Sequence, residues 1–380
     1  MFTPRELERR ILLAMLGAAA IAVPTVACRK EPAPAPIVEA DASARSKLCA
    51  NPIEKEDELC LAPFAEHPRS KGTGEPAPAP ARSAYDADGC LPKEMVSTGC
   101  CNPGLDGPRR KDGKCCYTVC TGVCCGRPFL VEGQPRIAGV AFERSSAWVV
   151  GPEPLPMLDE ATAHALGEAW LRDARMEHAS TAAFGRFMLQ LLALGGPADL
   201  VRRAALAAAD EVRHAELCFT LAARYLGASP SPAPLALDGA LDHARALPSI
   251  VADVIVEGCI GETIAALIAA RQLEGARDEK VAAALARIAE DEARHAELAW
   301  AFVRWAIEVG GDEARAAARD AFDRAAATGF SVPEAPGPVD PIVWRSHGRL
   351  TRGETARVME EAMSSVVAPC AAALLATSRS

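Results

Sequence analysis

Asp210-Glu-Val-Arg-His-Ala-Glu-Leu-Cys-Phe219 recurs 81 residues later as Asp291-Glu-Ala-Arg-His-Ala-Glu-Leu-Ala-Trp300. Seven of the ten positions are identical, and the charged residues stay in register. The sequence around both copies is rich in Ala, Leu, Arg and Glu with helical periodicity, which favours helices. We therefore interpret this region as two copies of one helical hairpin.

Glycine and proline interrupt the helical pattern at intervals that leave room for four long helices. The connection between the second and third helices has about 20 residues, so at ~3.3 Å per residue it reaches ~65 Å. A helix of 28 residues is only ~42 Å long, so this connection can run the whole length of a bundle. The expected fold class is all-α, with a four-helix bundle over 155–312 and an extra C-terminal helix within 350–378. The four helices are expected at about 159–194, 198–227, 248–274 and 278–309.

Each copy of the repeat contains a Glu-x-x-His motif, Glu211 with His214 and Glu292 with His295. The i, i+3 spacing places both side chains of a motif on one face of a helix. That face is also the apolar stripe of the helix, where charged groups are costly unless they are paired or bind metal. A single motif of this kind is common on solvated helices, but two in register indicate metal ligands.

Each hairpin needs a further carboxylate from its first helix. Glu177 lies on the apolar stripe of the first helix, at a depth that matches Glu211. The third helix offers Glu257 and Glu262, which lie ~140° apart around an α-helix. We prefer Glu257 as the ligand because it lies on the apolar stripe. Glu262 is kept as a supporting or shifting ligand and, with Thr181, as a candidate for lining a reaction pocket.

The resulting set has four carboxylates and two imidazoles, and two divalent cations would balance its charge. Oxygen-rich ligation with one imidazole per ion suits iron or manganese, whereas zinc favours tetrahedral sites with nitrogen and sulfur ligands. We therefore expect two iron ions, or two manganese ions, as the cofactor.

This constellation resembles the carboxylate-bridged di-iron proteins of the ferritin-like superfamily. These include the rubrerythrins, the small subunit of ribonucleotide reductase and the bacterial multicomponent monooxygenases. The resemblance covers about 160–310 and implies a ferritin-like bundle. It also implies that two metal ions are held by Glu177, Glu211, His214, Glu257, Glu292 and His295.

The longer Asp-Glu-x-Arg-His string is similar to the oxygenase and reductase branch of that superfamily. There the Asp hydrogen-bonds a ligand His across the bundle, so the resemblance implies that Asp210 and Asp291 support the ligand histidines. It further implies an oxidoreductase or oxygenase that activates O2 or peroxide on an unknown substrate, with its catalytic residues unassigned. The alternative is a protein that sequesters iron or uses the metal structurally, without catalysis.

The amino terminus has the layout of a secretory signal, with Arg5, Arg9 and Arg10 before the apolar run 11–27. The run ends in Thr25-Val-Ala-Cys28, which resembles the lipobox of bacterial lipoproteins. We therefore predict a signal peptide over 1–28, lipidation of Cys28, and an exported protein in the bacterial periplasm or anchored to the outer membrane. An uncleaved membrane anchor is the alternative.

Ten of the fourteen cysteines lie between Cys49 and Cys125. In an exported chain such a cluster indicates a small module held by disulfides. We expect a Pro/Ala-rich tether with the first cysteines over 29–85, and a disulfide module and linker over 86–150. A zinc site is the less favoured reading of these cysteines.

The net charge of the chain is −9 and no basic stripe appears, which excludes an electrostatic case for nucleic-acid binding. The expected partners are a membrane, through the lipid on Cys28, and a reductase or another protein of the cell envelope. The sequence leaves the oligomeric state open.

Overall fold

The computed structural model describes three long continuous stretches of the chain, 157–240, 246–328 and 339–376. Cys28, most of the expected signal peptide and most of the tether lie outside the described residues, so the expectations about them stay predictions. The shorter described segments are 5–6, 9–11, 55–61, 90, 105–111, 113–121, 127–131, 134–143 and 145–151.

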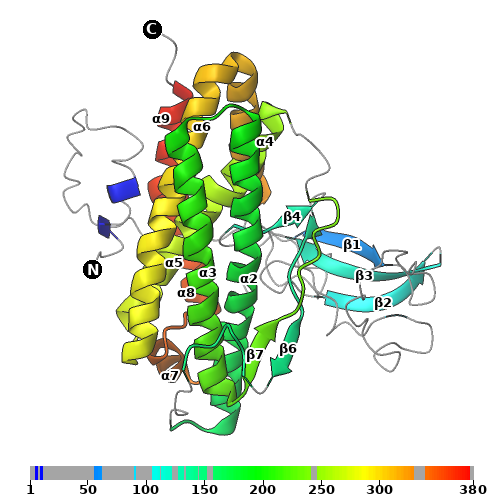
Figure 1. The fold of residues 1–380 in the computed structure, drawn as a ribbon, viewed down its shortest axis with the longest axis vertical. Helices are drawn as coiled ribbons and strands as arrows, with labels where there is room; N and C mark the ends of the chain where they lie inside the picture. Colours follow the sequence, from blue (N-terminus) through cyan, green and yellow to red (C-terminus); the bar gives the residue numbers. More distant parts are fainter. Residues whose placement is uncertain are drawn as a thin grey trace, which may run out of the picture.

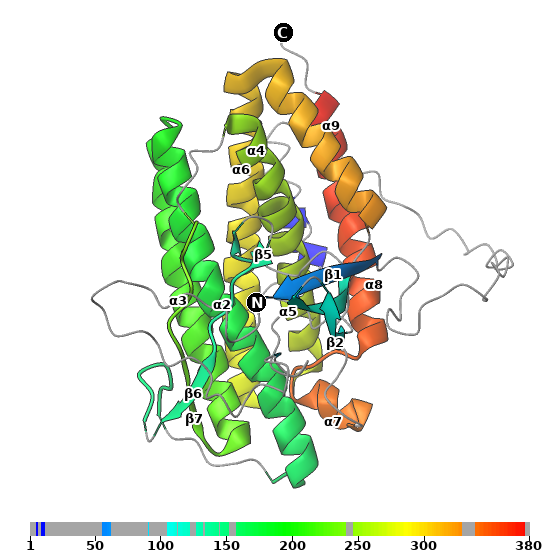
Figure 2. The same cartoon turned by 90° about the vertical axis from the view of Figure 1, so that its right-hand side faces the viewer.

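Helices make up most of the described residues, which confirms the all-α expectation at that level. Four long helical rods lie side by side (Figures 1 and 2), and we call them together the helical body. Two rods are single helices and one is a continuous run of three segments, while the fourth bends near its end. The segments are α2 (Glu160–Ala193), α3 (Ala198–Leu226), α4 (Leu247–Val254), η5 (Ile255–Glu262), α5 (Thr263–Gly275) and α6 (Glu279–Thr328).

Local signals in the sequence account for the ends of these helices. The side chain of Asp159 caps α2 by accepting a hydrogen bond from the backbone of Thr162 at 2.9 Å. Gly195 and Gly227 follow α2 and α3 with φ of +66° and +63°, a conformation that glycine adopts at little cost. Asp278 caps the start of α6 in the same way as Asp159 caps α2. The expected limits of the first three helices are therefore close to the observed ones.

Two features of the helical body depart from the expectation. The segment η5 is π-helical, with hydrogen bonds that span one residue more than in an α-helix. The fourth rod does not end at Gly310-Gly311. At Gly311, φ is 60° and ψ is −138°, so the chain bends there and continues as a helix to Thr328.

The close approach of η5 to α6 depends on a glycine. A Cβ added to Gly258 would lie 2.5 Å from the Cβ of Ala299, far inside van der Waals contact. Alanine on one helix and glycine on the other thus bring the two backbones together. Large aromatic side chains, including Trp170, Trp300 and Phe302, fill the remaining core.

The C-terminal helix is present as three continuous segments packed along α5 and α6 (Figure 2). Among the described residues, the helix Arg352–Ala376 is long and apolar enough to cross a membrane by length and composition. In this structure 44% of its most apolar window is buried. The segments are α8 (Arg352–Ala362), η6 (Met363–Val367) and α9 (Ala368–Ala376), preceded by the short α7 (Pro341–Ser346).

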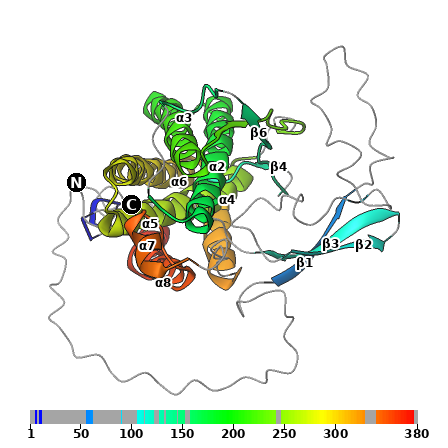
Figure 3. The same ribbon diagram turned by 90° about the horizontal axis from the view of Figure 1, so that it is seen from below.

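The cysteine-rich part contains an antiparallel sheet with the strand order β1–β3–β2. It lies beside the helical body (Figure 3). A disulfide joins Cys90 to Cys115, in the region where the sequence predicted disulfides. Tyr117, two residues after Cys115, is buried. The strands are β1 (Lys55–Leu61), β2 (Leu105–Lys111) and β3 (Lys114–Thr121).

The segment between this sheet and α2 already contacts the helical body through apolar packing and strand pairing. Phe129 and Val131 pack in one cluster with Ala179 and Ala183 of α2. The strand β6 (Val140–Glu143) pairs with β7 (Ser229–Pro232), which belongs to the connection between α3 and α4. Segment β4 (Leu130–Val131) pairs with β5 (Gln134–Pro135) between these two contacts.

Candidate metal centre

Four carboxylates and two imidazoles meet inside the helical body, supplied by α2, α3, η5 and α6. They form two overlapping groups, and in each the ligand atoms all lie within 4.8 Å of one another. Glu211 and Glu292 belong to both groups. The first group adds Glu177 and His214, and the second adds Glu262 and His295. Either group could hold a metal ion.

Burying these charged side chains together costs free energy unless a cation is bound. Glu211, Glu262 and Glu292 are at most 2% exposed, and the histidines are equally buried. Only the Glu177 side chain, 19% exposed, has appreciable contact with solvent. Several buried atoms of the cluster lack a hydrogen bond of good geometry: Glu211 Oε2, His214 Nδ1, Glu262 Oε1, Glu292 Oε2, His295 Nδ1 and His295 Nε2. Buried carboxylate oxygens and imidazole nitrogens that lie close together without such hydrogen bonds fit an oxygen-rich metal site.

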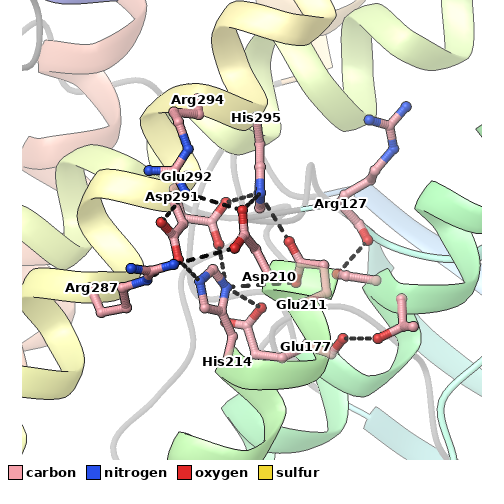
Figure 4. Close-up of polar contacts among 12 residues, drawn as sticks. Arg127, Glu177, Asp210, Glu211, His214, Arg287, Asp291, Glu292, Arg294 and His295 are labelled. Carbon is pink, nitrogen blue, oxygen red and sulfur yellow. Dashed lines mark hydrogen bonds and ion pairs between the residues drawn. The ribbon is translucent and has the colours of Figure 1, made fainter. Parts of the chain in front are cut away.

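The two histidines are related by the repeat, and each turns Nδ1 toward the carboxylates (Figure 4). His214 Nδ1 is 3.2 Å from Glu292 Oε1, and His295 Nδ1 is 3.0 Å from Glu211 Oε1. Each histidine therefore meets the shared carboxylate of the opposite repeat.

The other ring nitrogen of each histidine faces an aspartate of the opposite repeat. His214 Nε2 lies 3.1 Å from Asp291 Oδ2, and His295 Nε2 lies 3.6 Å from Asp210 Oδ2. The expected hydrogen bond across the helical body is present between His214 and Asp291. His295 Nε2 lies beyond hydrogen-bond distance of Asp210, so that pair is an ion-pair contact only. Such a partner fixes the tautomer and orientation of a ligand imidazole and raises its basicity.

Two arginines of α6 hold both aspartates, a role that the sequence did not predict (Figure 4). Arg287 Nε is 2.7 Å from Asp291 Oδ2, and Arg294 Nη2 is 3.1 Å from Asp210 Oδ2. Arg294 also contacts Asp291. The position of Arg294 in the Asp-Glu-x-Arg-His string was the available signal in the sequence for this role. The matching residue of the first repeat, Arg213, is exposed.

The structure corrects the preference for Glu257, which lies in neither ligand group. Its two carboxylate oxygens face Arg186 Nη2 at 3.1 Å and Arg127 Nε at 3.6 Å instead. The reason is the π-helical segment η5, whose wider turns rotate the residues that follow relative to a regular α-helix. Glu262 therefore reaches the cluster, although the α-helical stripe pointed to Glu257.

Thr181 lies one turn after Glu177 on α2, and its hydroxyl donates a hydrogen bond to the Glu177 carbonyl at 3.4 Å. This contact is with the backbone of its own helix. Thr181 is half-buried, and its expected place in a reaction pocket stays a prediction.

Burial has the largest effect on the acids of the cluster. It raises the pKa of Glu177 well above the usual range, and the nearby Glu211 raises it further. Burial and the neighbouring Glu292 raise the pKa of Glu262 in the same way. For Glu292 burial acts in the same direction, but the nearby imidazoles of His214 and His295 outweigh it and hold its pKa well below the usual range.

The histidines show the opposite balance. Burial lowers the pKa of His214 and His295, but contacts with Asp291 and Asp210, and with the glutamates, raise both well above the usual value. For Asp210, burial raises the pKa, and contacts with His295 and Arg294 then lower it to about 2. The raised pKa values favour protons on both imidazoles and on Glu177 and Glu262 in the metal-free protein. Bound cations would replace these protons in balancing the charge of the cluster.

The chain matches no protein-family model, no curated protein and no solved structure. The geometry itself defines a buried group of carboxylates and imidazoles that could hold metal, supplied by all four rods of the helical body.

Proposed function

We propose that this protein is an exported dinuclear metalloprotein with a ferritin-like four-helix bundle, and an oxidoreductase that uses O2 or peroxide. The bundle consists of the four rods of the helical body. The two ions are iron or manganese, held by Glu177, Glu211, His214, Glu262, Glu292 and His295.

The observation that carries this proposal is the placement of the two shared carboxylates. Glu211 directs Oε1 to His295 at 3.0 Å and Oε2 to His214 at 3.8 Å. Glu292 directs Oε1 to His214 at 3.2 Å and Oε2 to His295 at 3.4 Å. Each carboxylate thus offers one oxygen to each histidine side of the cluster, as a carboxylate between two ions must. A single-ion site would not require this duplication.

The donor chemistry supports iron or manganese over zinc. Each group has three carboxylates and one imidazole, and no thiolate among the described residues belongs to either group. Hard oxygen donors with an imidazole suit Fe²⁺ and Mn²⁺. When bound, two such ions would supply redox chemistry toward O2 or peroxide. The chain's part is to bury the ligands, place an aspartate beside each imidazole and hold protons on Glu177 and Glu262 when metal is absent.

Metal analysis of the purified full-length protein tests the proposal. After anaerobic loading with Fe²⁺ or Mn²⁺, we expect about two ions per chain. Glu211 and Glu292 belong to both ligand groups. The double substitution Glu211→Ala with Glu292→Ala therefore removes two ligands from each group and should abolish metal binding. Glu290→Ala is the matched control, because Glu290 lies on α6 outside both groups. Binding of fewer than two ions per chain by the wild-type protein would refute the dinuclear site.

Catalysis is tested separately from binding. The iron-loaded protein should consume O2 or peroxide over many turnovers when an artificial electron donor is supplied. A single stoichiometric reaction without turnover would favour the alternative function, a protein that holds or sequesters metal.

The proposed location rests on the amino-terminal sequence. Lipidation of Cys28 predicts that the protein fractionates with membranes and that Cys28→Ala releases it into the soluble fraction. Unchanged membrane association in that variant would refute the lipid anchor and favour an uncleaved leader.

A further inference from the structure

Arg127 lies in the segment that leaves the cysteine-rich part and enters the helical body. Its side chain is 1% exposed, although arginine is rarely buried without a partner. The guanidinium carbon lies 4.5 Å from the ring centroids of both Phe184 and Phe187 of α2. Its Nε is 3.6 Å from Glu257 Oε2. Arg127 therefore sits as a cation among aromatic rings beside a buried carboxylate.

Further contacts fix the same segment to α2. The carbonyl of Arg127 accepts a hydrogen bond from Ser180 Oγ at 2.8 Å. Arg186 contacts the carbonyl of Leu130 and lies 5.1 Å from the ring centroid of Phe129. The segment is held at several points, so the position of the Arg127 side chain is well defined.

The ring of Phe184 connects Arg127 to the metal centre. It lies edge-on to the imidazole of His295, with 4.9 Å between the ring centroids. Arg127, Phe184 and His295 thus form a continuous row of contacts from the incoming segment to one ligand. His295 belongs to only one of the two ligand groups, so this row reaches a ligand of one ion directly.

Cation–π attraction between Arg127 and the face of Phe184 opposes displacement of the ring. The ring in turn limits how the imidazole of His295 can tilt, because packed side chains resist small shifts. Groups that orient a ligand imidazole from outside typically change metal affinity about 10–100-fold when they are removed.

We propose that Arg127 is a positioning residue for the ion held by Glu211, Glu262, Glu292 and His295. The segment that leaves the cysteine-rich part then completes the metal centre and is more than a tether. This inference rests on the proposed dinuclear function. It goes further because it states that the affinities for the two ions depend differently on Arg127, a residue outside the repeat.

The test is a titration of the full-length protein with Mn²⁺ alone, comparing wild type with Arg127→Met, which keeps a long apolar side chain and removes the charge. We expect one ion to bind about tenfold more weakly and the affinity for the other to stay unchanged. Arg127→Lys restores a cation and should recover part of the lost affinity.

Arg349→Met is the matched control. Arg349 also lies over an aromatic ring, 4.7 Å from the centroid of Trp170, and pairs with Asp173. Neither partner belongs to the ligand groups. We expect this variant to lose thermal stability and to bind both ions as wild type does.

Equal affinities for both ions in Arg127→Met and wild type would overturn the proposal. Equal weakening of both ions, or the same selective weakening in Arg349→Met, would also overturn it. If Arg127→Met does not fold, Phe184→Leu removes the connecting ring and must show the selective weakening; wild-type affinities would refute the inference. A wild-type chain that binds fewer than two ions refutes the proposed function itself, and this inference with it.

Discussion

The two repeats carry nearly the same ten residues but build unequal halves of the metal centre. In the first half, Glu177 comes from a regular α-helix and its side chain is 19% exposed. In the second half, Glu262 comes from a π-helical segment and is 1% exposed. The two repeats therefore supply the same ligands, but the surrounding residues bury one side of the metal centre and leave the other side partly exposed to solvent.

The largest expected effect separates the two acids of the third rod. Glu262→Ala should lower the metal content from about two ions to about one, because Glu262 belongs to one ligand group. Glu257→Ala should keep two ions but lower the free energy of unfolding by about 3–5 kcal/mol, because it leaves the buried Arg127 and the half-buried Arg186 without their acid. Metal analysis and urea denaturation measure both effects. Loss of an ion in Glu257→Ala, with two ions kept in Glu262→Ala, would restore the original preference for Glu257.

The positions of Glu257 and Glu262 in the structure also show which features could not be predicted from the sequence. Glycine, proline and aspartate caps made the helix ends predictable, and the repeat identified both Glu-x-x-His motifs. The π-helical turns could not be predicted, because they accompany tertiary contacts, such as the approach of Gly258 to Ala299. Arg127 was missed because it lies outside the repeat in a segment without periodicity.

The aspartates behind the histidines sharpen the comparison further. Asp291 lies 3.1 Å from His214 Nε2 and is fully buried, whereas Asp210 lies 3.6 Å from His295 Nε2 with 17% of its side chain exposed. Asp291→Asn should weaken metal binding about 10–100-fold, and Asp210→Asn should weaken it less. Mn²⁺ titration of the two variants measures the difference. A larger loss in Asp210→Asn would contradict the order predicted from these distances.

Metal binding should strengthen as pH rises. In the metal-free protein the pKa values of His214, His295, Glu177 and Glu262 are all raised, so these groups keep their protons to higher pH than the same side chains do in water. Metal must displace those protons, so affinity falls as pH falls and protons are released on binding. Calorimetric titration with Mn²⁺ in buffers of different ionisation enthalpy measures the released protons. Affinity that does not vary with pH and binding without proton release would contradict these shifts.

The smallest expected effect concerns the arginine of each repeat. Arg294→Ala removes the contact with Asp210 and Asp291 and should lower the free energy of unfolding by about 1 kcal/mol, since the arginine is partly exposed. Arg213→Ala, the matching change in the first repeat, should have almost no effect because Arg213 is exposed. Thermal or urea unfolding compares the two. Equal losses would mean that the repeats are more symmetric than the structure indicates.

The most direct test of the central claim is anomalous X-ray diffraction from crystals of the iron-loaded protein, recorded at the iron edge. We predict two peaks inside the helical body, one beside His214 and Glu177 and the other beside His295 and Glu262, with Glu211 and Glu292 between them. A single peak, or peaks away from these six residues, would contradict it.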